Sequence, residues 1–201
     1  MANRRMGETA KGLHKMSTEQ ITLPEVPPPP SSGEFGVFLK SKSINSTPLG
    51  NDANSVEMLE LETKDLVNAC QFLKDSKETG FDFLVLISSI DLKKGFQIAY
   101  TLHSTKTKKS LRIKITVPKN NPILPTVSHL WSTADWYERE AYDMMGIIFT
   151  GHPNLKRILN PDNWEGYPLR KDYIPPADAL NGPHPITEVE FAEKTLSKPS
   201  N

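Results

Sequence analysis

Alternation of apolar and polar side chains marks the middle of the chain as sheet-forming. In residues 111–118 (LRIKITVP) every second side chain is apolar and those between are polar, which predicts a strand with one buried face. Residues 95–104 (GFQIAYTLHS) repeat this pattern, and residues 81–91 (FDFLVLISSID) are apolar enough to predict a buried strand. Residues 55–62 (SVEMLELE) carry apolar groups on both faces and predict a further strand.

A helix is expected between the first two of these strands along the chain. Apolar residues recur at helical spacing from Leu66 to Leu73, with Thr63 placed as N-cap and Gly80 as C-cap. The connections between the last three strands, LKK and TKTKK, are too short for parallel crossovers and predict an antiparallel meander. The sequence therefore predicts an α+β fold, with a small, mostly antiparallel sheet covered by helices.

Helical spacing returns over residues 127–145, where two short helices are expected, with a break near Ser132 or Thr133 and an end at Gly146. From Gly151 onward the chain is rich in proline and glycine, so it must run mostly as extended chain. Its aliphatic and aromatic side chains cannot all be buried within such a segment. We therefore expect it to lie on another surface.

Three parts follow from this pattern. Residues 1–54 contain the proline run LPEVPPPP and are expected to be poorly ordered or ordered against a partner, with a short helix near GEFGVFLKS. Residues 55–150 form the α+β domain. Residues 151–201 form an extended docking segment and tail.

Composition narrows the function classes. The formal net charge is zero, which gives no electrostatic support for nucleic-acid binding. The single cysteine, Cys70, cannot form an internal disulfide or hold zinc or an iron–sulfur cluster alone. No apolar run approaches the roughly 20 residues of a membrane span, and the N-terminus lacks the apolar core of a secretory signal. A soluble, intracellular protein is expected.

The stretch WYEREAYDMMGIIFTGHP concentrates the candidate chemistry. Its carboxylates could be catalytic, but Glu138 and Glu140 project roughly 200° apart on a helix and cannot form a close pair. Arg139 and Asp143 are four residues apart and are expected to pair across one turn. An amphipathic helix with a charged rim is the favoured interpretation.

The remaining polar candidates also favour contacts over catalysis. His152 stands in a Gly-His-Pro turn without a second histidine at ligand spacing, so we expect it to bond a backbone carbonyl or a partner's carboxylate. In PLRKDY, alternation sends Arg170 and Lys171 to opposite sides, and Arg170 is suited to bidentate bonds with a carboxylate. Neither a phosphate-binding glycine loop nor a nucleophile elbow occurs in the sequence.

The motifs EREAYDMMGIIFTGHPNLKRIL and GYPLRKDY resemble the signature of the thirty-kilodalton subunit of respiratory complex I, the proton-pumping NADH:quinone oxidoreductase. The resemblance is sharp over residues 131–174, follows the order of elements over 56–118, and is absent from 1–54 and 177–201. Met144-Met145 depart from many relatives, which have an aromatic residue there. The same signature occurs in ferredoxin- or plastoquinone-linked relatives and in membrane-bound hydrogenases, so it does not specify the electron donor.

The resemblance implies a non-catalytic scaffold in the peripheral arm, on the cytoplasmic face of the inner (plasma) membrane or on an organellar inner membrane. Its extended segment would wrap the hydrogenase-like large subunit (the forty-nine-kilodalton subunit) near the quinone site and support assembly with other peripheral-arm subunits. NADH, FMN, iron–sulfur clusters and quinone would be bound by partner subunits, and none by this one. The alternative is a free-standing metal-dependent enzyme that uses Glu138 or Glu140 with His152. The expected partner interface comprises Glu138, Arg139, Glu140, Asp143, His152, Arg157, Trp164, Arg170, Lys171 and Asp172.

Overall fold

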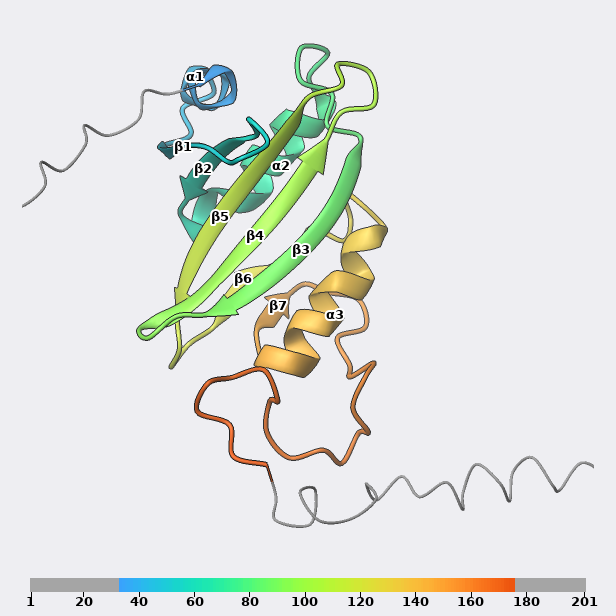
Figure 1. The fold of residues 1–201 in the computed structure, drawn as a ribbon. Helices are drawn as coiled ribbons and strands as arrows, with labels where there is room; N and C mark the ends of the chain where they lie inside the picture. The colour runs from blue at the N-terminus through green and yellow to red at the C-terminus, as the bar shows by residue number, and fades with distance from the viewer. Residues whose placement is uncertain (1–32, 176–201) are drawn as a thin grey trace, which may run out of the picture.

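A computed structural model describes residues 33–175, which form a five-stranded sheet with helices and a short second sheet (Figure 1). The strand order is β1-β2-β5-β4-β3, and β6 pairs with β7. The elements are α1 (Glu34–Ser41), β1 (Ser46–Asn51), β2 (Glu57–Leu61), a 3-10 turn (Thr63–Asp65), α2 (Leu66–Asp75), β3 (Phe83–Asp91), β4 (Gly95–His103), β5 (Ser110–Pro118), β6 (Ile123–Pro125), α3 (Thr133–Met145) and β7 (Ile148–Thr150). The mixed α+β architecture agrees with the predicted fold class.

The predicted meander is present. Strand β4 pairs antiparallel with both β3 and β5, and the apolar rows of β4 and β5 are buried on the same face of the sheet. Strand β2 joins β5 in parallel, which is the one parallel pairing of this five-stranded sheet.

Strand β3 is not the buried strand expected from its composition. It lies at the sheet edge, where Phe83 is 48% and Ile90 is 51% exposed. The register with β4 shifts between Leu84 and Leu86, so the alternation of buried and exposed side chains is interrupted there. An apolar run does not distinguish a central strand from an edge strand, because the neighbours that cover it are set by the fold.

Ordered structure begins before residue 55, where the sequence suggested it would start. Helix α1 and strand β1 both precede that residue, and β1 pairs antiparallel with β2. The Glu57 carboxylate accepts the N–H groups of Phe35 (3.1 Å) and Gly36 (2.9 Å), so it satisfies the first turn of α1. Phe35 then packs edge-on against Phe81, with ring centroids 5.0 Å apart. The chain before residue 55 thus contributes to the same core.

Two further boundaries differ from expectation. Helix α2 ends at Asp75 instead of Gly80, because Ser76 is extended and the Thr79 hydroxyl and Phe81 N–H bond the Leu73 carbonyl. Residues 127–131 form hydrogen-bonded turns in place of a helix. Helix α3 follows with Ser132 as N-cap and the left-handed Gly146 as C-cap, as predicted for the second helix.

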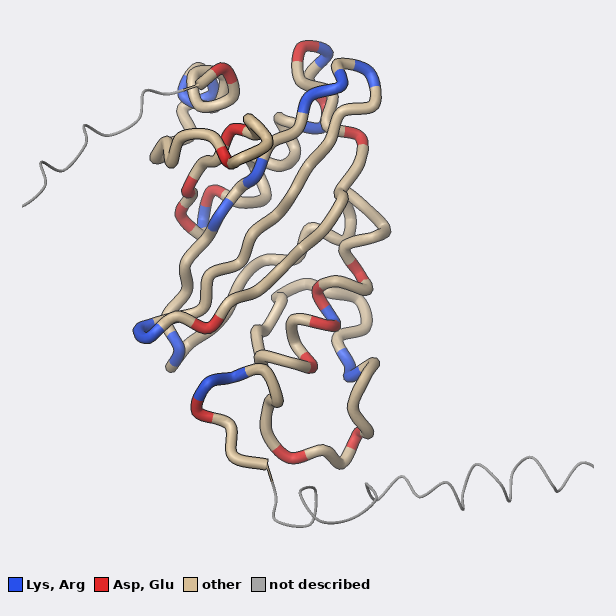
Figure 2. Tube along the Cα trace, viewed as in Figure 1, with Lys and Arg blue, Asp and Glu red and all other residues tan. Residues whose placement is uncertain are grey.

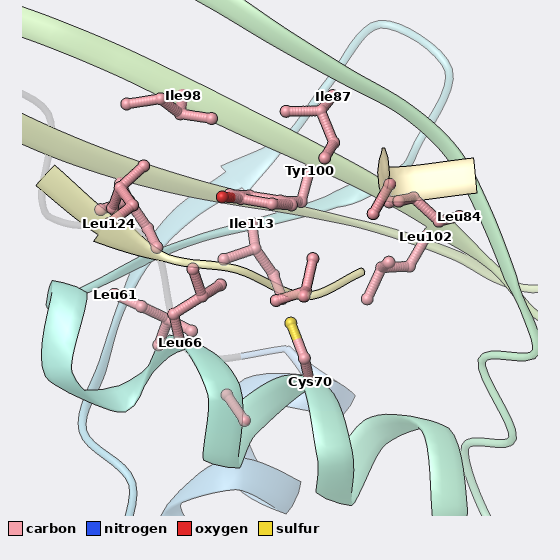
Figure 3. Packing of buried hydrophobic residues seen from close by; sticks show 14 of the residues in the cluster. Leu61, Leu66, Cys70, Leu84, Ile87, Ile98, Tyr100, Leu102, Ile113 and Leu124 are labelled. Carbon is pink, nitrogen blue, oxygen red and sulfur yellow. The ribbon is translucent and has the colours of Figure 1, made fainter. Parts of the chain in front are cut away.

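The core lies between the sheet and α2. In Figure 3 Cys70 points from α2 toward the sheet, with Tyr100 and Ile113 among the apolar side chains in front of it. Leu66 and Cys70 are fully buried, which agrees with the amphipathic spacing of α2, and Tyr100 of β4 is fully buried opposite them. No helix between residues 33 and 175 is both long and apolar enough to cross a bilayer.

Candidate functional site

The segment from residue 151 to 175, here called the strap, contains no helix or strand and consists of turns and extended chain. It leaves β7, loops around the C-terminal end of α3 and reaches the β3–β4 turn (Figure 1). Two backbone contacts fix this path: Leu169 N–H donates to the Met144 carbonyl at 3.0 Å, and Lys171 N–H donates to Asp91 at 2.8 Å. Both contacts lie near the C-terminal end of the strap and attach it to α3 and to the end of β3.

Asp143 is the central anchor of the strap. One of its carboxylate oxygens accepts the N–H groups of Ile158 (3.0 Å), Leu159 (2.7 Å) and Asn160 (2.9 Å). The other accepts Arg157 at 2.7 Å and the Asn160 side-chain amide at 2.9 Å. Burial raises the pKa of Asp143, but the bonds from Asn160, Arg157 and Leu159 outweigh it and lower the pKa to about 2. A helical carboxylate thus organises three consecutive amides of the strap.

Asp143 forms its ion pair with Arg157. The four-residue spacing had predicted a pair with Arg139 instead, and that prediction is wrong. Arg157 also donates to the Asp143, Trp164 and Gly166 carbonyls, each at 3.0 Å. Its guanidinium lies 5.3 Å from the centroid of the Tyr167 ring. One arginine therefore connects α3 with two separate parts of the strap.

Arg139 and Arg170 bind backbone carbonyls rather than carboxylates. Arg139 donates through Nε to the Lys156 carbonyl at 3.2 Å and stacks 4.8 Å from the Trp136 ring centroid. Arg170 donates through Nε to the Met145 carbonyl at 2.6 Å, at the C-terminal end of α3, where a cation is favoured by the helix dipole. The Arg170 guanidinium is also 5.0 Å from the Phe96 ring and 4.5 Å from the Tyr167 ring.

Glu138 points into the core, beside His152 at the start of the strap. Its side chain is fully buried, and it accepts the Val127 N–H at 2.8 Å and contacts the Thr126 hydroxyl. Burial raises the pKa of Glu138 to about 7, with the two bonds acting in the opposite direction. The Thr126 hydroxyl also lies 2.8 Å from the Ser128 hydroxyl and has only one proton. A protonated Glu138 would donate to Thr126 and leave the threonine proton for Ser128.

His152 is buried beside this carboxyl group. Its Nδ1 accepts the Asn154 N–H at 3.0 Å, so the neutral ring carries its proton on Nε2. Nε2 lies 3.2 Å from the Asp135 carbonyl, 2.9 Å from the Asp135 carboxylate and 3.9 Å from Glu138. The expected bond to a backbone carbonyl is therefore found, and it is to this chain's own helix.

The other titratable groups facing Glu138 are also inside the core. Burial, and after it the neighbouring Glu138 charge, raises the pKa of both Cys70 and Tyr100. The Tyr100 hydroxyl has no hydrogen-bond partner among residues 33–175. The side chains of Cys70, Tyr100 and Glu138 are thus closed to solvent in the core.

The outward-facing part of the predicted interface is smaller than the sequence suggested. Glu140, Lys171 and Asp172 are exposed, and Trp164 is half-buried. Four large apolar side chains on α3 and the strap are also exposed: Trp136, Leu159, Leu169 and Ile174 are between 56% and 86% exposed. Glu138, Arg139, Asp143, His152, Arg157 and Arg170 bond within the chain, so any contact with a partner would be made through the strap that they hold.

Sequence reasoning overlooked Asp91 and Asn160, which hold the strap. Asp91 is 2% exposed, binds Lys119 at 2.7 Å and receives the Lys171 N–H. Bonds from Lys119 and Lys171 outweigh the effect of burial and lower the pKa of Asp91. The sequence signal for Asp91 is its position as a charged residue at the end of an apolar strand, where a carboxylate needs a bonding partner. Within the part of the chain that the structure describes, no three His, Cys, Asp or Glu side chains converge as a metal site.

Comparison with known proteins identifies the family. Residues 59–179 match the model for the respiratory-chain NADH dehydrogenase 30 kDa subunit. The chloroplastic NAD(P)H-quinone oxidoreductase subunit J of Chaetosphaeridium globosum is 39% identical over 150 residues, 72% of this chain and 88% of the relative. A subunit of the NADH-quinone oxidoreductase of Chloroherpeton thalassium is 40% identical over 129 residues, 61% of this chain and 54% of that protein.

Solved structures agree with the fold. A trypsin-resistant fragment of Nqo5 superposes with a TM-score of 0.51 at 27% identity, over 59% of this chain and 95% of the fragment. A chain of the membrane-bound sulfane sulfur reductase, an archaeal respiratory membrane complex, gives a TM-score of 0.58 at 18% identity, over 82% of this chain and 92% of that chain, and shows the fold alone. This chain belongs to the family of the 30 kDa subunit of respiratory-chain NADH dehydrogenase.

Proposed function

We propose that the chain is a non-catalytic structural subunit in the peripheral arm of a proton-pumping NADH:quinone oxidoreductase. In this proposal the strap docks on the hydrogenase-like large subunit near the quinone site and supports assembly. The observation that carries it is the strap itself. Its polar groups are bonded to α3 and β3, while Leu159, Leu169 and Ile174 remain exposed on its outer side.

The polar side chains support a scaffold role over a catalytic one. The side chains of Glu138, Asp143 and His152 in the signature motif are buried and bonded to backbone groups of the same chain. A substrate could not reach Glu138 or His152 in this arrangement. NADH, FMN, iron–sulfur clusters and quinone would accordingly be bound by partner subunits.

The relatives' names leave two forms of the complex. One relative is named as a chloroplastic NAD(P)H-quinone oxidoreductase subunit and the other as an NADH-quinone oxidoreductase subunit. We propose the cytoplasmic face of the inner (plasma) membrane as the location, with an organellar inner membrane as the alternative. A flavin-bearing NADH module among the partners distinguishes the NADH-linked form from a ferredoxin- or plastoquinone-linked one.

Affinity purification from gently solubilised membranes tests the proposal. The tagged chain is expected to co-purify with a hydrogenase-like large subunit and with iron–sulfur subunits, identified by mass spectrometry. Recovery of the tagged chain alone, together with a stoichiometric metal ion, would instead support the free-standing enzyme.

A further inference from the structure

Four segments far apart in the sequence meet at one end of the molecule. They are residues 92–95, 118–123, 146–148 and 167–172, here called the basic end face. Gly95 pairs with Pro118, and Ile123 pairs with Ile148. The strap joins them where Arg170 binds the Met145 carbonyl and Lys171 N–H binds Asp91.

This face carries cations with little opposing charge. Lys93, Lys94 and Lys171 are exposed, and no ion pair involves their side chains within residues 33–175. Figure 2 shows the basic residues on the β3–β4 turn and on the nearby strap. Asp172 is the one acidic residue of the four segments, and the adjoining Asp91 is buried and already paired with Lys119.

Aliphatic side chains lie on the same segments. Leu92 and Ile123 are each 37% exposed, Ile148 is 42% exposed and Leu169 is 56% exposed. Exposed aliphatic groups beside unpaired lysines are typical of a surface that meets an apolar patch bordered by carboxylates. Because the strap contributes Leu169 and Lys171, the face is complete only when the strap is anchored.

We propose that the basic end face is a docking surface for an acidic, partly apolar surface of a partner protein. The proposal rests on the proposed function, in which that partner is the hydrogenase-like large subunit. A protein fits better than an anionic bilayer, because none of the exposed side chains of this face is aromatic. Membrane-binding surfaces usually place Trp, Tyr or Phe at the interface.

Charge reversal tests the proposal. The variant Lys93→Glu/Lys94→Glu/Lys171→Glu is expressed as the full tagged chain, and recovery of the large subunit is compared with that of the wild-type chain. We expect recovery to fall at least about tenfold, and wild-type recovery to fall when the salt rises from about 0.1 to about 0.5 M. The matched control is Lys40→Glu/Lys77→Glu/Lys106→Glu, which changes the same charge at exposed positions elsewhere and should retain wild-type recovery.

A second variant, Leu92→Ser/Leu169→Ser, tests the aliphatic component without changing charge. It is expected to lower recovery several-fold at both salt concentrations. Because every substituted side chain is exposed, we expect all variants to have the melting temperature of the wild-type chain. Equal melting temperatures would exclude unfolding as the cause of lost recovery.

The outcomes separate the two proposals. If the wild-type chain fails to recover the large subunit, the proposed function is wrong and this inference is withdrawn with it. If the wild-type chain recovers it and the triple variant does so equally well, only the docking surface is wrong. Loss of sedimentation with phosphatidylglycerol vesicles, with unchanged recovery of the large subunit, would assign the face to a membrane and overturn the proposal.

Discussion

At the scale of single residues, the buried Glu138 makes the stability of the fold depend on pH. Burial raises its folded-state pKa to about 7, above the unfolded value, so the folded state holds a proton that the unfolded state has lost. This contribution to stability is complete below the unfolded pKa and is lost as the pH rises through 7. The shift corresponds to a loss of about 3 kcal/mol.

Glu138→Gln removes this titration while keeping a side chain that can bond Val127 and Thr126. Between about pH 5 and pH 8 the wild-type free energy of unfolding should decline relative to that of the variant. Urea unfolding of both proteins across this range measures the difference in their free energies of unfolding. Titrating groups that the two proteins share affect both equally and cancel in this difference. Asp143 does not interfere, because its lowered pKa places its own loss of stability near pH 2. Parallel pH profiles for both proteins would contradict the assignment.

Asp143 is the residue on which the strap depends most. Asp143→Asn leaves Arg157 without its charge partner and reduces the acceptors for three backbone amides. The expected cost is on the order of 3 kcal/mol, concentrated in the strap. Trypsin should then cleave after Lys156 and Arg157 several-fold faster than in the wild-type protein. Glu140→Gln, which removes the same charge at an exposed position, should leave the cleavage rate unchanged.

The residues of this site were easier to predict than their partners. The signature motif indicated Asp143, Arg157 and Arg170 by sequence alone. The pairing of Asp143 with Arg139 was wrong, because helical spacing brings two side chains within reach but does not reveal a competing arginine from a distant segment. Arg157 prevails since it also satisfies the carbonyls of Trp164 and Gly166.

At the scale of elements, Gly146 both ends α3 and makes room for the strap. Its φ is +69°, and an added Cβ would lie 2.5 Å from Arg170 Nη2 and 2.6 Å from the Tyr167 ring. Gly146→Ala should therefore cost more than the ~1–2 kcal/mol of a left-handed non-glycine residue. Gly151→Ala is the control: it has a φ of +82°, but its Cβ would meet only Thr126 at 3.4 Å. Equal losses in melting temperature for the two variants would show that strap crowding contributes nothing.

The elements that sequence predicted well are those with long, regular periodicity. In strands β4 and β5 the apolar side chains alternate over nine residues each, and in helix α3 they recur at helical spacing over thirteen residues. The three-residue strands β6 and β7 are too short to carry a period, and they pair only because the fold brings them together. Helix α1 was expected, but its attachment depends on Glu57, more than twenty residues later.

At the scale of the whole molecule, Arg139 and Arg170 connect the strap to the domain. The guanidinium group of each donates to a backbone carbonyl. Arg139→Ala and Arg170→Ala each remove a donor to a backbone carbonyl and a cation stacked on an aromatic ring. The strap should lose its fixed path, and with it the exposed aliphatic side chains that we propose contact the large subunit. Fewer complexes should form, while each complete complex should work normally.

Quantifying the assembled complex on native gels, and quinone reduction per complex in the same membranes, separates these two quantities. We expect a several-fold loss in the amount of complex, with turnover per complex within about twofold of wild type. Lys106→Ala, an exposed cation remote from the strap, should change neither. Arg170→Lys should recover only part of the loss, because an ammonium group cannot both donate to Met145 and stack on Tyr167 and Phe96 as a planar guanidinium does. Normal assembly with lost turnover would place these arginines in the reaction and contradict a scaffold role.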